Sequence, residues 1–192
     1  MAGKQAKTLT AKQIEIALRA LADTRHASRN RLLFLLSVKA GLRACEMARL
    51  TWDMVTDSDG QIGPAIELTD AASKMGSGRT IPMHKSLREA LTTWRHECQA
   101  DKAYVICSER GDRMSAASVV NWFSKLYRSL DLQNCSSHSG RRTFITNLAR
   151  ELPRLGGSLR DVQELAGHKS LQVTQRYIEG DAEIKRRLIE RL

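Results

Sequence analysis

The sequence RNRLLFLLSVKAG, residues 29–41, is apolar around almost the whole circumference of a helix. A helix without a polar face must be buried in a protein core, and glycine is the residue that most often follows a helix end. Its longest apolar run, Leu32 to Leu36, is far shorter than the roughly 20 residues of a membrane-spanning helix. We therefore predict a buried helix over residues 29–40, ended by Gly41, in a globular domain that does not cross a membrane.

Helices are also predicted on both sides of this segment. Thr10 to Gln13 match a capping box, and apolar residues then follow at helical spacing, so a helix is expected over residues 11–22. The other predicted helices begin at capping or turn residues: they cover about 44–50, a stretch that starts at the capping box Ser86 to Glu89, a stretch that starts at Ser115, 139–151, 158–166, a stretch that starts at Ser170, and 181–192.

Residues 52–83 follow a different pattern. Two turn-forming clusters, residues 57–60 and 75–78, separate short stretches of strand-like composition. These stretches predict a small antiparallel sheet of about three strands, and residues 104–107 predict an isolated strand. The predicted fold class is mainly α with a small antiparallel β-sheet, an α+β fold.

The composition fits one globular domain. At about 150 residues per domain, a chain of 192 residues leaves room for a single domain, which we assign to residues 1–192 with a flexible segment over 1–9. Hydrophobic residues make up 42% and charged residues 27% of the chain, which is too apolar for a disordered protein. The N-terminus is polar through Thr10 and lacks the apolar segment of a secretory signal, so we expect a cytoplasmic protein.

The charge is strongly positive. The chain has 31 Lys and Arg residues against 21 Asp and Glu residues, a net charge of +10. A surplus of this size favours a polyanionic partner such as nucleic acid.

The cysteines do not suggest a metal site or a disulfide framework. Cys45, Cys98, Cys107 and Cys135 are widely spaced along the chain without a C-x-x-C motif, which is typical of reduced thiols. His96 lies close to one of them, but no second pair of ligands appears at zinc spacing. We expect neither a metal nor another cofactor.

Two segments place basic side chains at helix starts. Arg43 follows the helix-ending Gly41, and Glu46 lies three residues later, where its carboxylate can orient the guanidinium. Taken alone, this pattern is more simply a surface arginine with a neighbouring acid. His138 and Arg141 lie three residues apart at the start of a predicted helix, on one face and beside free backbone N–H groups that favour an anion.

Three more residues are candidates only through their context. Lys74 precedes the turn at residues 76–78, at the predicted tip of a hairpin, where a lysine is normally a solvated charge. His168 follows Gly167 at a helix boundary, and Tyr177 comes nine residues later, where a lone tyrosine is usually a core residue. Patterns of one or two fixed residues arise often by chance, so none of these identifies a site by itself.

The order and spacing of these residues together resemble the catalytic domain of the tyrosine recombinases, the phage integrase family, over about residues 8–190. In that family a tyrosine attacks a DNA phosphodiester and forms a 3′-phosphotyrosyl link, which releases a free 5′-hydroxyl. The resemblance implies that Tyr177 is the nucleophile and that Lys74 protonates the departing 5′ oxygen. It also implies that Arg43 and Arg141 hold the non-bridging phosphate oxygens, that His138 assists proton transfer, and that His168 hydrogen-bonds the scissile phosphate.

The chemistry accounts for these residue types without a metal. A phosphoryl transition state spreads negative charge over its equatorial oxygens, and two guanidinium groups meet that charge as fixed bidentate donors. A tyrosine with a pKa of about 10 is a poor nucleophile at neutral pH until a positive field or a base favours its anion. Because the covalent link conserves the energy of the broken bond, rejoining needs no ATP and no cofactor.

Two departures from the family pattern lead to further expectations. The family usually has a large apolar residue where this chain has Gly140, so we expect looser packing around Arg141. Family members generally carry a separate N-terminal DNA-binding domain, whereas the match here begins almost at the start of the sequence. We therefore expect either a naturally short member that works as a bare catalytic domain or a fragment of a longer protein.

The resemblance further implies double-stranded DNA as the substrate, a tetramer that pairs two duplexes, and accessory DNA-bending proteins. It implies a bacterial or phage protein that is associated with the nucleoid when bound to DNA. The apolar stripe on the basic predicted helix 181–192 is typical of a helix that packs on its own core or docks onto a neighbouring protomer. Two other functions stay open: a DNA-binding regulator with weak or lost catalysis, and a type IB topoisomerase.

Overall fold

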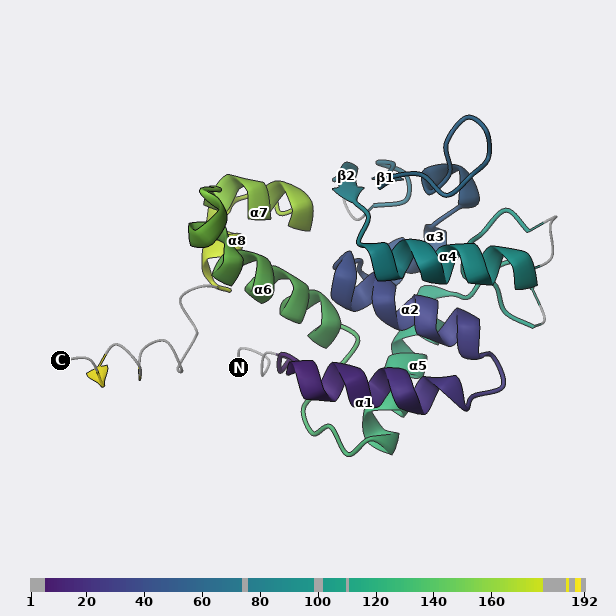
Figure 1. Ribbon diagram of the computed structural model, residues 1–192, viewed down its shortest axis with the longest axis horizontal. Coiled ribbons are helices and arrows are strands. Elements are labelled where there is room, and N and C mark those ends of the chain that lie inside the picture. The colour runs from purple at the N-terminus through teal and green to yellow at the C-terminus, as the bar shows by residue number, and fades with distance from the viewer. Residues whose placement is uncertain are drawn as a thin grey trace.

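The computed structural model describes residues 6–73, 76–98, 102–109, 111–177, 186, 189 and 190. The described elements are mostly helices, arranged as Figure 1 shows. In chain order they are α1 (Ala11–Ala22), α2 (Ala27–Lys39), α3 (Ala44–Arg49), the 3-10 helix η1 (Trp52–Met54), β1 (Ala65–Leu68), β2 (Arg79–Pro82), α4 (Lys85–Glu97), α5 (Ala116–Ser129), α6 (Ser139–Leu155), α7 (Leu159–Ala166) and α8 (Leu171–Gln175).

Helix α2 lies at the centre of the main core, which confirms the prediction from its apolar sequence. The five side chains from Leu32 to Leu36 are each no more than 1% exposed. Helices α1, α4 and α6 all pack on α2, and Figure 1 shows α2 between α1 and α4. A helix with no polar face has to be covered on every side, so these three neighbours follow from its composition.

The sheet has two strands among the described residues, where about three were predicted. Strands β1 and β2 pair antiparallel, with Ala65 opposite Pro82 and Leu68 opposite Arg79. Residues 57–61 fold back on themselves instead of extending, because the Asp57 carboxylate accepts hydrogen bonds from two backbone N–H groups of the same loop. What was expected as a third strand is therefore a single bridge, Thr56 to Ile62.

The predicted strand over residues 104–107 is also reduced to one bridge, between Thr51 and Tyr104. Val105 and Ile106 are both fully buried, although successive residues of a strand point to opposite faces. This segment runs through the core, where side chains on both sides find apolar neighbours, instead of lying on the edge of a sheet.

Helix boundaries follow the local signals with three exceptions, and the first is α2, which begins at Ala27, two residues before its predicted start. The capping box at Thr10 is present, as predicted. Helix α4 begins one residue before Ser86, because His84 is its N-cap and accepts a hydrogen bond from the Ser86 N–H. Helix α6 continues past the predicted end at residue 151 and contains Pro153 in its last turn, ending at Gly156 with φ +68°. Pro153 cannot donate to the carbonyl four residues earlier, yet the helix continues for two residues after it.

Residues 6–9 differ from the flexible segment that was expected. The Leu9 N–H donates to Thr143 Oγ1 at 2.7 Å, and Arg142 Nη1 donates to the Ala6 carbonyl at 2.9 Å. The Leu9 side chain is 5% exposed. Both partners lie in α6, so this segment is attached to the helix on which His138 and Arg141 were predicted. Residues 1–5 lie outside the described part of the chain.

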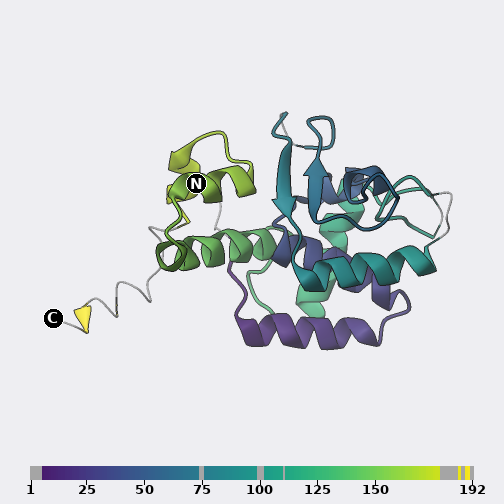
Figure 2. The same ribbon diagram turned by 45° about the horizontal axis from the view of Figure 1, so that its top comes forward.

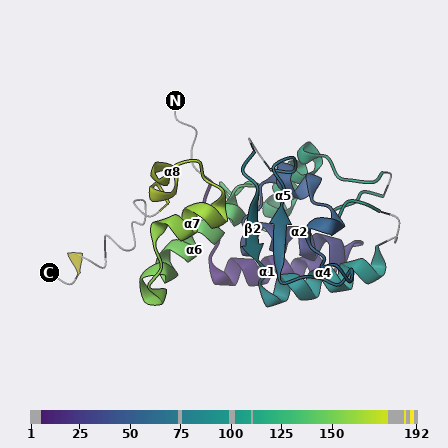
Figure 3. The same cartoon turned by 90° about the horizontal axis from the view of Figure 1, so that it is seen from above.

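A smaller core joins α6 and α7. Its buried members are Ile145, Val162 and Ala166, and Tyr177 packs against them. Helix α7 contacts both α6 and β2, so it lies between α6 and the sheet, as Figures 2 and 3 show. Most of the predicted C-terminal helix over 181–192 lies outside the described residues.

Two thiols that are distant in sequence come together in the fold. Cys98 Sγ and Cys107 Sγ lie 3.7 Å apart, and all four cysteines are free. None of the described helices is both long and apolar enough to span a bilayer.

Candidate active site

Arg43 begins the site at the start of α3. Gly41 ends the preceding helix with φ +62°, a conformation that side chains other than glycine rarely adopt, and this turn places Arg43 as the N-cap of α3. Glu46 lies one helical turn later. Its carboxylate accepts from the Arg43 backbone N–H at 2.9 Å and from Arg43 Nη1 at 2.6 Å, so the orienting role predicted for Glu46 agrees with its geometry.

Glu46 also binds a second arginine, which the sequence analysis missed. Arg79, the first residue of β2, donates from Nη1 and Nη2 to the two carboxylate oxygens at 3.2 Å and 3.1 Å. Glu46 is fully buried, and burial alone would raise its pKa. The hydrogen bonds and charges of Arg79 and Arg43 outweigh burial and hold the pKa of Glu46 below its ordinary value. The carboxylate is therefore a fixed anion between two guanidinium groups.

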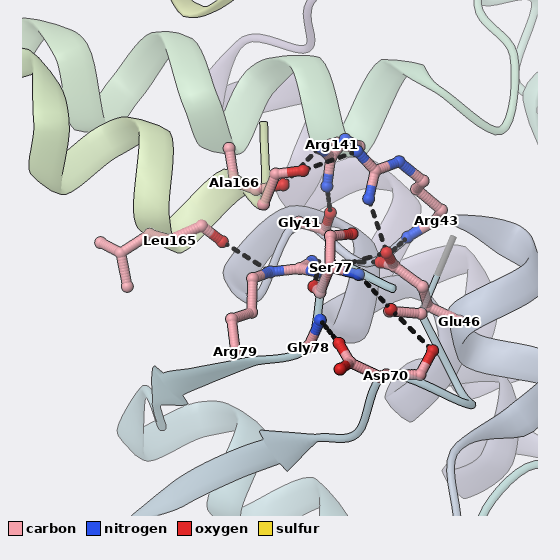
Figure 4. A network of polar contacts seen from close by, with 12 residues as sticks. Gly41, Arg43, Glu46, Asp70, Ser77, Gly78, Arg79, Arg141, Leu165 and Ala166 are labelled. Carbon is pink, nitrogen blue, oxygen red and sulfur yellow. Dashed lines mark hydrogen bonds and ion pairs between the residues drawn. The ribbon is translucent and has the colours of Figure 1, made fainter. Parts of the chain in front are cut away.

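Three arginine side chains donate hydrogen bonds to carbonyl groups at the C-terminal end of α7 (Figure 4). Carbonyl groups in the last turn of a helix lack intrahelical partners and form the negative end of the helix dipole. Here they are matched by three guanidinium groups: Leu165 O accepts from Arg79 Nε at 2.9 Å, Ala166 O from Arg141 Nη2 at 2.6 Å, and Gly167 O from Arg43 Nη2 at 3.2 Å.

Arg141 is held in the first turn of α6. Its guanidinium also donates to the Gly41 carbonyl at 2.7 Å, and the residue is 4% exposed. Burial, followed by the charge of Arg43, lowers the pKa of Arg141 to about 10, so Arg141 is still a cation at neutral pH. Arg43 and Arg141 thus lie side by side as cations, anchored by carbonyl groups. Arg43 is held in addition by the Glu46 carboxylate, which accepts from Arg43 Nη1 at 2.6 Å.

Gly140 tightens the packing around Arg141, so the expectation of looser packing is wrong. A Cβ at this position would overlap Ser37 Oγ and would lie 2.8 Å from Ser37 Cβ and 3.0 Å from Val38 Cγ1. The start of α6 therefore approaches α2 as closely as a missing side chain allows. This close approach brings the Arg141 side chain within reach of the Gly41 carbonyl, which follows α2.

His168 and Tyr177 form the other side of the site. Gly167 ends α7 with φ +60°, and His168 follows it. The imidazole and the phenol rings stack with centroids 5.4 Å apart, and His168 Nδ1 shares a hydrogen bond with Thr174 Oγ1 at 2.9 Å. Burial, and then the charges of Arg141, Arg43 and Arg79, lower the pKa of His168 to about 4. His168 is therefore a neutral imidazole at pH 7.

His138, Arg141 and Tyr177 line one open cavity of about 330 Å³. Arg142 and Arg176 line the same cavity, which makes it strongly basic. His138 is exposed at the N-cap of α6, as the sequence placed it. Tyr177 follows α8 and reaches the same cavity as Arg141.

Five of the six predicted residues thus lie together in the fold. Lys74 lies outside the described residues. The turn that follows it, Gly76 to Gly78, lines a second cavity of about 690 Å³ between β2 and α7, together with His168 and Lys169. Within the described part of the chain, no group of three or more His, Cys, Asp or Glu side chains is arranged to hold a metal ion.

Arg79 was missed because no neighbouring residue in the sequence marks an arginine at the start of a strand as part of a site. A pattern signal did exist, since side chains two apart on a strand share a face. Ile81 is buried, so Arg79 occupies an inward position on β2, and an inward arginine requires a buried acid or carbonyl partner.

The sequence pattern of the phage integrase family matches residues 7–183. The tyrosine recombinase XerA of Thermococcus kodakarensis is 29% identical over 194 residues, which cover 97% of this chain and 64% of that protein. The tyrosine recombinase XerC of Brucella melitensis biotype 1 is 30% identical over 168 residues, or 85% of this chain and 49% of that protein. The chain therefore spans about half to two thirds of the length of these relatives.

Solved structures show the same fold. A crystal structure of XerA recombinase superimposes with a TM-score of 0.76 at 22% identity and covers 98% of this chain and 65% of that one. The Tn1549 transposon integrase in complex with a circular intermediate DNA also gives a TM-score of 0.76, at 19% identity, and covers 100% of this chain and 67% of that one.

Proposed function

Because the chain belongs to the phage integrase family, we propose that it is a site-specific DNA recombinase, which cleaves and rejoins DNA strands through a 3′-phosphotyrosyl intermediate. One observation carries the proposal. Two anchored guanidinium groups, from Arg43 and Arg141, converge beside a tyrosine that stacks on a neutral histidine. This is the set of groups that phosphoryl transfer to a tyrosine requires in the absence of a metal.

The arginines bind the scissile phosphate. The carbonyl groups of Gly41, Ala166 and Gly167 fix the orientation of both side chains before DNA arrives. Their remaining N–H groups then meet the non-bridging oxygens without having to reorganise, which is the main source of electrostatic catalysis. The partly water-excluded position of Arg141 strengthens its interaction with the negative charge that develops in the transition state.

Tyr177 then attacks the phosphorus. A bond forms between the phenolic oxygen and phosphorus, and the bond between phosphorus and the 5′ oxygen breaks. The phenolic proton is lost with the assistance of His138, and Lys74 supplies a proton to the departing 5′ oxygen. When His168 Nδ1 accepts from the Thr174 hydroxyl, the ring proton lies on Nε2, which then donates to a phosphate oxygen as a neutral hydrogen-bond donor. The reverse reaction, with a 5′-hydroxyl as nucleophile, rejoins the strand.

The substrate is double-stranded DNA, in keeping with the net charge of +10 and with solved relatives bound to DNA, such as a lambda integrase dimer on a core site. Recombination exchanges strands between two duplexes, so we propose that four protomers assemble on paired sites and that DNA-bending proteins assist them. The protein acts where its DNA lies, in the cytoplasm at the nucleoid.

The decisive experiment captures the covalent intermediate. The full chain is incubated with a pool of genomic DNA fragments, the mixture is denatured with detergent, and fragments that stay attached to protein are sequenced. Recovered sites are then built into nicked suicide duplexes, on which cleavage traps the adduct. We expect an adduct with the wild-type chain and none with Tyr177→Phe, whereas Tyr104→Phe, a matched tyrosine substitution outside the site, retains it.

The alternative functions give different results. Binding to recovered DNA without any adduct would identify a regulator and would end the enzymatic proposal. Relaxation of a supercoiled plasmid that lacks the recovered site would point to a topoisomerase. Binding should also weaken steeply with salt, because each phosphate contact releases a counterion. A flat salt response would contradict an interface dominated by phosphates.

A further inference from the structure

Arg79 is buried in the middle of the site, although the resemblance gives it no role. Its side chain is 6% exposed. The guanidinium donates to both carboxylate oxygens of Glu46, to Leu165 O at 2.9 Å, and to Ser77 O at 3.4 Å. Figure 4 shows Arg79 reaching from the start of β2 between these partners. Donors on all three of its nitrogen atoms are thus engaged by the protein.

Each partner of Arg79 supports a different part of the site. Glu46 binds Arg43 through its side chain and its backbone N–H. Leu165 belongs to the last turn of α7, where the two following carbonyl groups accept from Arg141 and Arg43. A shift of Arg79 would therefore move the supports of both phosphate-binding arginines together.

Steric contact adds to these hydrogen bonds. Gly167 has a positive φ, and a Cβ there would lie 2.8 Å from Arg79 Nη1 and 3.1 Å from both Cδ and Cζ. The arginine side chain therefore packs flat against the turn that ends α7. His168 is the next residue, so the contact between Arg79 and Gly167 also positions the backbone of His168 and with it the imidazole.

On the premise of the recombinase chemistry proposed above, we propose that Arg79 is a positioning residue. It holds Arg43, through Glu46, and the last turn of α7 in the geometry that binds the scissile phosphate, and it does not itself contact DNA. A guanidinium is required because its planar fork binds both carboxylate oxygens while Nε reaches a third group, which a lysine ammonium cannot reproduce.

The proposal separates the rate of cleavage from the affinity for DNA. A misplacement of about 1 Å in a catalytic constellation costs about 100-fold in rate, so Arg79→Lys should cleave a suicide duplex about 100-fold more slowly in a single turnover. Its Kd for the same duplex, and the slope of log Kd against log salt, should stay within about threefold and about one charge of wild type, because no phosphate contact is lost.

Variants and controls are chosen to keep the test decisive. Arg79→Gln leaves Glu46 with a single cationic partner and is at risk of unfolding, so Glu46→Gln with Arg79→Gln supplies a neutral pair of similar size. This double variant should cleave no faster than Arg79→Lys, because the neutral pair does not orient Arg43. The matched control is Arg19→Gln on α1, whose side chain is 78% exposed and which should cleave at the wild-type rate. Thermal unfolding checks that each variant is folded at the assay temperature.

A second readout needs no DNA. The proton titration of His168, followed by NMR of its ring carbon and hydrogen, reports the end of α7 directly. In wild type we expect the midpoint at a pKa of about 4. In Arg79→Lys the charge is kept but the support of α7 is lost, so we expect the His168 pKa to rise by at least about one unit as water reaches the ring.

These readouts distinguish the two proposals. If the wild-type chain forms no adduct on any DNA, the proposed function fails, and the His168 titration still decides whether Arg79 positions α7. Arg79→Lys with both the wild-type rate and the wild-type His168 pKa would refute the positioning role. A loss of DNA affinity and of salt slope as large as the loss of rate would instead make Arg79 a DNA contact and would also refute it.

Discussion

Gly140→Ala tests the close approach of α6 to α2. The new methyl group would lie 2.8 Å from Ser37 Cβ and 3.0 Å from Val38 Cγ1, and would overlap Ser37 Oγ. These atoms belong to α2, which packs on α1, α4 and α6 and has little room to move. The substitution therefore has to push the start of α6 away from α2.

The expected cost follows from two opposing effects. Overpacking a dense core costs about 1–3 kcal/mol, whereas alanine is better than glycine in a helix by at most about 1 kcal/mol, and less in the first turn. We expect a net loss of about 1–2 kcal/mol in the free energy of unfolding. For a chain of this size that loss corresponds to a fall in Tm of about 2–8 °C.

Ser37 supplies a matched control. Its hydroxyl is buried without a hydrogen-bond partner among the described residues, so Ser37→Ala alone should be neutral or slightly stabilising. The double variant Gly140→Ala with Ser37→Ala removes the worst overlap and should recover about 0.5–1 kcal/mol relative to the sum of the single changes.

Equilibrium urea unfolding of the four proteins measures this coupling, with the m-value as a check that the unfolded surface is unchanged. Gly140→Ala also displaces the Arg141 backbone, so adduct formation should fall more than the folded fraction does. Equal or greater stability of Gly140→Ala, or strict additivity with Ser37→Ala, would show that α6 does not press on α2 as described.

Three further predictions concern the site and its supports. Arg141→Lys keeps the charge but loses the fork that binds two carbonyl groups, so single-turnover adduct formation should fall about 100- to 1000-fold, and a rate within threefold of wild type would contradict the anchoring role. The pKa of His168, about 4 when folded, is depressed below its unfolded value near 6.5, so its contribution to stability is fully present above pH 6.5 and is lost as pH falls toward 4. Urea unfolding should show a fall of about 1–2 kcal/mol over this window, allowing for partial exposure of the ring, and His168→Gln should remove most of the slope. Thr143→Val removes the acceptor of the Leu9 N–H and should cost about 1–3 kcal/mol in unfolding free energy, with faster hydrogen exchange at the Leu9 amide; an unchanged amide would show that the N-terminal segment is not held there.

Local signals in the sequence accounted for most of the helices. The capping boxes at Thr10 and Ser158 and the glycine after α7 act within one turn of chain, so their geometry was readable without the fold. The predictions of a helix end at residue 151 and of a third strand were wrong. Helix α6 continues through Pro153 although proline lacks the N–H that would donate in this last turn, and the carboxylate of Asp57 closes a loop where a third strand was expected.

The site was predictable where chemistry alone restricts the residue type. Arg43, His138, Arg141, His168 and Tyr177 were recognised from order and spacing, and the fold brings them together; the role of each stays a prediction. Arg79 and Gly140 could not be assigned in this way, because an arginine at a strand start and a glycine in a first turn each have many ordinary explanations. Their meaning depends on Glu46 and Ser37, which lie 33 and about 100 residues away.

The sequence by itself determined the buried character of α2, most of the helix ends, the excess of positive charge and the choice of candidate side chains, because these depend on residue type and on neighbours within a few positions. Tertiary structure alone decided how those side chains are held. Every residue has a backbone carbonyl group, so the sequence does not distinguish the carbonyl groups at the end of α7 and after α2 from any others. Only the fold turns four of them toward Arg43, Arg79 and Arg141, and packs Gly140 on α2 closely enough for Arg141 to reach the Gly41 carbonyl.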